Sequence, residues 1–159
     1  MRTTKSGLGT AMNPEDAPRA QEGKVYITDA DGKRRLALEV TKVEAKANVK
    51  TEEVPRLGQR WVAHKAINGT LQLTMTAYKS TMYFDRAVAE FGLTGILPTF
   101  DVNVYSFDPS TEIGADSKTY RDCVIDGDVL LSMLDAEGTF ITQEITMYAN
   151  DCDLQSLYR

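Results

Sequence analysis

The stretch VEAKANVKTEEVPRLGQRWVAHKAINGTLQLTMTAYKSTMYF, residues 43–84, decides how this chain is interpreted. Its segments 43–49 and 71–77 alternate apolar and polar side chains, which is the pattern of half-buried β-strands. Between them lie about twenty highly charged residues, although connections in compact domains are usually about 2 to 6 residues long. Trp61 and Val62 stand there among basic residues. We therefore expect residues 50–66 to form a projecting arm that contacts another protein.

The composition is that of an ordinary globular domain. The 159 residues are 42% hydrophobic and 26% charged, which suits one domain, residues 23–159, with a substantial core. The net charge of -5 argues against a protein that grips nucleic acid, because neutralising phosphates requires clustered Lys and Arg. No apolar window approaches the roughly 18 residues that span a bilayer, and no signal peptide is recognisable. We expect a chain that is neither exported nor membrane-bound.

Two smaller features complete this outline. Residues 1–22 combine glycines and prolines with few large apolar side chains, so we expect a flexible N-terminal arm. Cys123 and Cys152 lack CxxC spacing and a neighbouring histidine, which favours free thiols over a disulfide or a metal site.

The strand pattern changes phase once near the start of the body. Residues 24–28 alternate and lead into an Asp/Gly turn at 29–32, which predicts a hairpin. The next strand is apolar at 36, 38 and 40, and then at 43, 45, 47 and 49. Because side chains in a strand have a period of two, this change of parity near Thr41 and Lys42 predicts a bulge or a bend.

One helix and a meander are expected in the second half. Ser80 or Thr81 is placed to cap a helix with apolar residues at 84, 87, 88 and 91, and Gly92 is placed to end it. Strand patterning resumes at 100–105, followed by a polar loop at 108–118 and β-rich runs at 120–125, 129–134 and 140–148. About seven antiparallel strands with one flanking α-helix predict a mainly β fold, either a β-sandwich or a split β-barrel.

The residue pattern offers no catalytic constellation. His64 is the only histidine and has no nucleophile motif beside it. The acidic pairs at 29/31 and 126/128 coincide with glycine turns, and the twelfth position from Asp29 is Val40 in place of the Glu that closes a calcium loop. No glycine-rich loop precedes a Lys-Ser/Thr pair. We therefore expect no enzyme activity, no catalytic residue, no metal and no cofactor.

Several short motifs follow one another in order across residues 22–91. They are Glu22-Gly23, Val43-Glu44-Ala45 with Asn48-Val49, Gly58-Gln59-Arg60, His64-Lys65, Gly69-Thr70, Tyr78-Lys79, Thr81 and Phe84. None is specific alone, but their order resembles the tail tube proteins of contractile-tailed bacteriophages, defective prophages and phage-tail-like bacteriocins. The chain departs from shorter members in its longer N-terminal arm and in the loop at 108–118.

The resemblance implies a structural protein with the phage tail tube fold. Such a protein self-assembles into hexameric rings that stack as the inner tube of a contractile tail, and inner strands of neighbouring subunits join into one β-barrel that closes their edges. The implied partners are the tail sheath, the tape measure protein, the baseplate or tube initiator and the tail terminator. DNA or other cargo passes through the lumen without specific binding. The implied location is the virion tail, or a phage-tail-like particle, assembled in the bacterial host cytoplasm.

Two sets of residues take roles under this resemblance. The inter-subunit contact arm would use Glu52, Glu53, Arg56, Gln59, Arg60, Trp61, Val62, His64 and Lys65. Polar positions that would face the lumen are Gln72, Thr74, Thr142 and Glu144. The negative net charge predicts a net-negative wall that repels DNA phosphates.

The residues leave alternatives open. The arm is either such a contact, within a ring or between rings, or a surface hairpin without a partner. A small β-sandwich module that binds a carbohydrate or another ligand is an alternative function, and an all-β enzyme is a weaker one because the chain has a single histidine.

Overall fold

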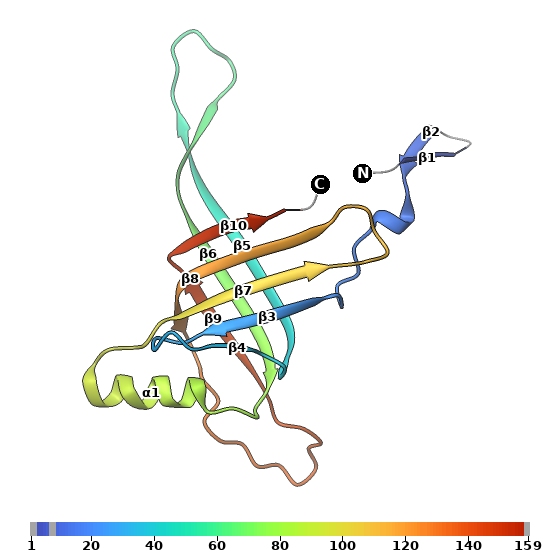
Figure 1. Cartoon of the computed structure of the whole chain (residues 1–159). Coiled ribbons are helices and arrows are strands. Elements are labelled where there is room, and N and C mark those ends of the chain that lie inside the picture. Colours follow the sequence, from blue (N-terminus) through green and yellow to red (C-terminus); the bar gives the residue numbers. More distant parts are fainter. Residues whose placement is uncertain (1–2, 7–8, 158–159) are drawn as a thin grey trace.

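The body of the protein is mainly β (Figure 1). The computed structural model describes residues 3–6 and 9–157. In chain order the elements are β1 (Thr3–Ser6), β2 (Gly9–Met12), the short 3-10 helix η1 (Pro14–Asp16), β3 (Gly23–Thr28), β4 (Arg34–Leu36), β5 (Val40–Val54), β6 (Ala63–Tyr78), α1 (Tyr83–Thr94), β7 (Phe100–Phe107), β8 (Ala115–Asp126), β9 (Thr142–Ala149) and β10 (Asp151–Ser156). This confirms the predicted mainly β, antiparallel fold with one α-helix in the described residues, and eight strands form its main sheet.

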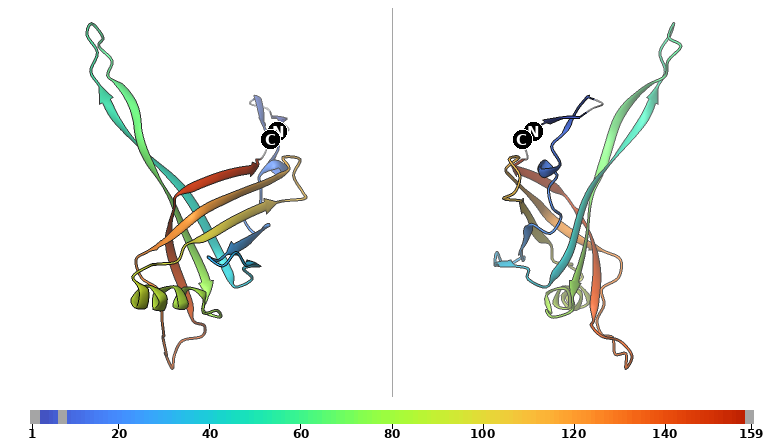
Figure 2. Two further views of the ribbon diagram at one scale, coloured as in Figure 1. Left: turned by 60° about the vertical axis from the view of Figure 1, so that its left-hand side comes forward. Right: turned by 90° about the vertical axis from the view of Figure 1, so that its right-hand side faces the viewer.

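The eight-stranded sheet is folded at β8. The strand order is β4-β3-β7-β8-β9-β6-β5, with β10 also paired to β8. One edge of β8 pairs with β7, whereas its other edge pairs with β10 at residues 117–121 and with β9 at residues 124–126. Only Asn150 separates β9 from β10, so the chain crosses there from one half of the sheet to the other. The β5-β6-β9 half-sheet and the β3-β7-β8 half-sheet therefore lie at an angle to each other (Figure 2).

A single apolar core joins the two half-sheets and the helix. Removing these side chains from water is the main favourable contribution to folding. Phe84 of α1 meets Phe100 of β7 edge to face, with ring centroids 5.5 Å apart, which holds the helix over one end of the core. The largest fully buried apolar side chains are Leu73, Met75, Val102, Ile145 and Met147.

The helix has other boundaries than the sequence predicts. Its N-cap is Met82, which makes no side-chain capping hydrogen bond, so the prediction of Ser80 or Thr81 is wrong. Gly92 lies inside the helix, and the helix ends before Gly95, which has a φ of 75°. A helix interior tolerates a glycine, whereas the left-handed residue that ends a helix strongly favours one.

The predicted change of parity is confirmed. The pairing of β5 with β6 shifts register between Val40 and Lys42. Ahead of it the chain turns, because the Leu38 N–H donates to the carbonyl of Leu36. Ala37 is buried there while Leu38 is exposed, so the expected single strand from 36 to 49 is divided into β4 and β5.

The segment 127–141 is a long loop and not a strand. The predicted strand at 129–134 is therefore wrong, and the last long strand begins at Thr142 instead of Phe140. β8 pairs with β9 only as far as Asp126, and a β-rich run becomes a strand only where it finds a partner. β10 escaped prediction because its sequence, DCDLQS, alternates weakly.

The N-terminal segment has local structure and one strong attachment. β1 and β2 form a separate two-stranded sheet, and residues 1, 2, 7 and 8 of the expected flexible arm lie outside the described residues. The Arg19 guanidinium donates to both carboxylate oxygens of Asp108, at 3.0 and 2.9 Å. The backbone N–H of Arg19 donates to the same carboxylate, at 3.0 Å.

No helix in the described residues has both the length and the apolar composition needed to cross a membrane.

Candidate assembly surfaces

The predicted contact arm is the outer part of one long hairpin. β5 and β6 are paired from Val40 opposite Ala77 out to Val54 opposite Ala63. This hairpin projects well beyond the body (Figures 1 and 2). Strand pairing thus continues through the charged residues that lie between the two strands expected from the sequence. Charged side chains are tolerated there because both faces of this part of the hairpin meet solvent. A second register shift, between Lys50 and Thr51, marks where the arm begins.

The structure brings all nine predicted arm residues together as exposed side chains. Glu52 lies opposite Lys65, and Glu53 lies opposite His64, across the two strands. The remaining five lie in the turn, residues 55–62, which we call the tip. In the tip, the Arg56 Nη2 donates to the carbonyl oxygen of Trp61 at 3.2 Å. The arm is thus a braced hairpin whose predicted contact side chains are all exposed.

Sequence reasoning missed one apolar residue of the tip. Leu57 is fully exposed, and Trp61 and Val62 are 82% and 58% exposed. The available signal was a large apolar side chain among polar neighbours two residues after Pro55. Exposed apolar side chains gathered at one place are typical of interaction sites.

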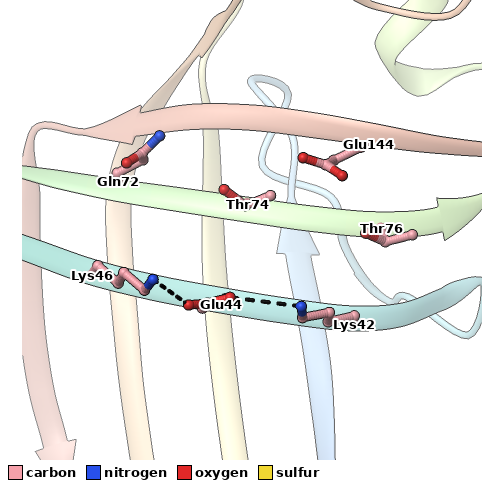
Figure 3. A pocket seen from close by; sticks show the side chains of 7 residues that line it. All are labelled: Lys42, Glu44, Lys46, Gln72, Thr74, Thr76 and Glu144. Atoms are coloured by element: carbon pink, nitrogen blue, oxygen red, sulfur yellow. Dashed lines mark ion pairs between the residues drawn. The ribbon is translucent and has the colours of Figure 1, made fainter.

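The outer side of the β5-β6-β9 half-sheet is a polar face. Figure 3 shows side chains from three neighbouring strands lying side by side on it. They are Lys42, Glu44 and Lys46 of β5, Gln72, Thr74 and Thr76 of β6, and Glu144 of β9. Three of the four predicted lumen-facing residues, Gln72, Thr74 and Glu144, are among them. Thr142 lies two residues before Glu144 on the same strand and so belongs to the same face.

Sequence reasoning missed the contribution of β5 to this polar face. Lys42, Glu44 and Lys46 alternate with Val43 and Ala45, so their parity was the available signal. The register confirms their place, because Lys46 lies opposite Gln72 and Glu44 lies opposite Thr74.

The charges of the polar face are balanced. The Lys46 Nζ lies 2.7 Å from one Glu44 carboxylate oxygen, and the Lys42 Nζ lies 3.8 Å from the other. The hydrogen bond and charge of Lys46 lower the pKa of Glu44, and Glu44 raises the pKa of Lys46. With Glu144 the face of Figure 3 has two cations and two carboxylates, whereas the net charge of the chain suggests a negative wall.

The outer edge of β5 has no partner strand in the described residues. β5 ends the strand order, and its 15 residues pair only with β6. Such an edge presents a row of unpaired N–H and C=O groups and is a template for another strand. β5 therefore contributes both to the polar face and to this open edge.

The two cysteines and the single histidine are the other candidate reactive groups. Both cysteines are free thiols, as predicted, with Cys123 buried and Cys152 half-buried. Burial raises the pKa of Cys123 to about 12, which keeps the thiol protonated. His64 is exposed on the hairpin. In the part of the chain that the structure describes, no three His, Cys, Asp or Glu side chains are placed to hold a metal ion.

The molecule thus combines a projecting hairpin, an open strand edge and a largely polar sheet face. The sequence matches the phage tail tube protein family over residues 10–155, and the chain belongs to that family. It is a tail tube protein, a structural component of a phage tail or a related particle. No curated protein matches the sequence.

Solved structures share the fold at low sequence identity. One comes from the extended sheath-tube complex of the extracellular contractile injection system PVC, with a TM-score of 0.64 and 11% identity over 91% of this chain and 95% of the other. A second is from the sixfold-symmetrised baseplate of the anti-feeding prophage, with a TM-score of 0.61 and 8% identity over 85% and 93%. A third is from the tube terminating cap of that prophage, with a TM-score of 0.62 and 13% identity over 88% and 91%.

Proposed function

We propose that the protein assembles into hexameric rings that stack into the inner tube of a contractile tail. In this arrangement the β5-β6-β9 half-sheet faces the lumen and the β3-β7-β8 half-sheet lies outside it. The observation that carries the proposal is the polar face. Its seven side chains come from three adjacent strands and include no apolar residue, which suits the wall of a conduit for DNA or other cargo.

The open edge of β5 supports ring formation. A free edge of 15 residues is an aggregation hazard unless it is covered, and closing strands into a barrel removes the hazard. Pairing this edge with a neighbouring copy, and repeating the contact around a closed ring, would satisfy each backbone edge. The sixfold symmetry used for the anti-feeding prophage baseplate is consistent with a ring of six.

The partners follow from the same arrangement. The similar proteins belong to a sheath-tube complex, a baseplate and a tube terminating cap. By analogy, this tube would meet a sheath on its outer side, a baseplate or initiator at one end and a terminator at the other, with a tape measure protein setting its length. The particle would be assembled in the cytoplasm of a bacterial host, and the protein would have no enzymatic role.

The first experiment is negative-stain electron microscopy of the purified full chain, combined with sedimentation. Rings or hollow tubes are expected. A protein that stays monomeric across concentrations and salts, and that binds glycans in a screen, would support the alternative of a ligand-binding module.

A second experiment locates the lumen. In a Cys152→Ser background, where the buried Cys123 is unreactive, Thr74→Cys is compared with Ala89→Cys on the exposed side of α1. Before assembly, a bulky maleimide should label both variants. After assembly it should label only Ala89→Cys, and equal labelling of Thr74→Cys in intact tubes would show that the polar face is not enclosed.

A further inference from the structure

Two apolar surfaces lie at opposite ends of the molecule. The tip of the hairpin, residues 55–62, is the far end of the projection, and the loop at 127–141 extends from the other end of the body (Figures 1 and 2). The views agree on this placement. No residue of either segment belongs to the buried cluster, and only Val129, at the start of the loop, packs against it.

The tip combines apolar side chains with positive charge. Leu57, Trp61 and Val62 are 101%, 82% and 58% exposed. Arg56 and Arg60 stand among them, and the tip sequence PRLGQRWV contains no Asp or Glu. A surface of large apolar and arginine side chains has the composition typical of interface centres.

The loop combines apolar side chains with negative charge. Leu131, Leu134 and Phe140 are 57%, 97% and 76% exposed. The segment from 127 to 141 also has three carboxylates, Asp128, Asp135 and Glu137, and no Lys, Arg or His. It therefore matches the tip in apolar character and opposes it in charge, although both belong to the same chain.

We propose that the tip of one copy docks on the 127–141 loop of a copy in the next ring. The inference rests on the proposed tube and identifies its axial contact. Because the two surfaces differ and lie at opposite ends, each copy offers a tip on one side and a loop on the other. Such a heterologous contact repeats along one direction and builds a filament.

This contact assigns the arm to the axial direction. The outer edge of β5 stays available for the neighbour within the ring, since the docking uses the tip beyond Val54. The loop is also the segment that fails to become a strand despite its β-rich sequence. A docked tip would remove the exposed apolar side chains of this loop from water.

Charge reversal tests the pairing. Arg56→Glu with Arg60→Glu reverses the tip, and Asp128→Lys with Glu137→Lys reverses the loop; Asp135 is left unchanged because its carboxylate accepts the N–H of Glu137. Each reversed pair should raise the protein concentration needed for tube assembly by about tenfold or more, since attraction becomes repulsion. All four side chains are exposed, and the hydrogen bond that Arg56 loses lies within the tip, away from the core. The thermal unfolding of the monomer should therefore stay unchanged.

The combined variant decides the outcome. Joining both reversals should restore assembly toward the wild-type concentration. A matched control joins the reversed tip to Asp31→Lys and Glu15→Lys, two exposed acids outside the loop, and should not restore it. Wild-type assembly by either reversed pair, or equal rescue by the control, would overturn the docking while leaving the tube itself intact.

Crosslinking gives a separate readout. In the Cys152→Ser background, Leu57→Cys and Leu134→Cys proteins are assembled together and treated with a short bismaleimide. Tip-to-loop dimers should form in the mixture and not with either variant alone. Dimers formed by Leu57→Cys alone would show that tips meet each other, which contradicts the axial pairing. Absence of any tube in the wild-type protein would instead count against the proposed function.

Discussion

At the scale of single residues, Asp108 shows how a buried carboxylate is held by several hydrogen bonds. It is fully buried, and its carboxylate accepts hydrogen bonds from Arg19 and from the backbone and hydroxyl of Ser110. The bond to the Arg19 guanidinium, followed by that to Ser110, holds its pKa well below the ordinary range. The sequence identifies Asp108 only as the start of a polar loop, because its partner lies 89 positions away.

Acid should release the N-terminal segment only at very low pH. Because the pKa of Asp108 is lowered on folding, its contribution is fully present above the ordinary carboxyl pKa of about 3.9 and is lost as the pH falls through the lower folded value. The protection factor of the Arg19 amide, which corrects for the pH dependence of intrinsic hydrogen exchange, should therefore stay constant from neutral pH down to about pH 4. Asp108→Asn should speed this exchange throughout that range. Unchanged exchange in the variant would show that other contacts hold the segment.

Trp61→Ala should separate folding from assembly. The side chain is 82% exposed, so its removal should change the free energy of unfolding by less than about 0.5 kcal/mol. Sedimentation and electron microscopy should nevertheless show impaired polymerisation, because a large aromatic anchor is lost from the tip. Normal tubes from this variant would exclude Trp61 as a contact.

At the scale of elements, local pattern and strand pairing have different reach. The alternation at 43–49 and 71–77 correctly predicts two strands of the β5-β6 hairpin, and the change of parity correctly predicts the bulge at Val40 and Lys42. The pattern does not reveal that pairing extends through the charged arm, nor that 129–134 lacks a partner. Both outcomes depend on which backbone edge lies alongside, which is set by residues far away in sequence.

Glycine substitutions should distinguish the hairpin from the helix. At Gly69 a Cβ would lie 2.9 Å from the backbone oxygen of Asn48, so Gly69→Ala should strain the hairpin, by about 1–3 kcal/mol. At Gly92 a Cβ meets nothing within 4 Å, so Gly92→Ala in α1 should stabilise the protein, by up to about 1 kcal/mol.

Thermal unfolding gives the sign of both effects. Hydrogen exchange should place the Gly69→Ala effect in the amides of residues 48–70. If Gly69→Ala were as stable as the wild-type protein, the two strands of the hairpin would have moved apart to accommodate the added methyl group.

At the scale of the whole molecule, the polar face, the tip and the 127–141 loop are three separate surfaces around one core. The core takes one side of each half-sheet, the polar face takes the outer side of β5-β6-β9, and the tip and the loop occupy opposite ends (Figures 1 and 3). A net charge of -5 does not describe these surfaces separately, since the polar face is balanced and the tip and the loop have opposite signs.

Glu44 should keep the tube from holding DNA. It pairs with both Lys42 and Lys46, so Glu44→Gln leaves two lysines facing a single remaining carboxylate on this face. Assembled Glu44→Gln tubes should retain short double-stranded DNA on co-sedimentation at low salt and release it at high salt. Adding Lys46→Gln should abolish the retention by restoring the balance. Variant tubes that hold no more DNA than wild type would remove Glu44 from this role.

The sequence alone was sufficient for the β-rich class of the fold, for the main strands and the helix, and for the resemblance to tail tube proteins, because alternation, periodicity and short motifs are local properties of the chain. It also located the arm. Only the tertiary structure decided that the arm is a paired hairpin, that three strands share one charge-balanced polar face, and that the tip and the 127–141 loop stand at opposite ends. These are relations between distant segments, and they arise from strand pairing and core packing.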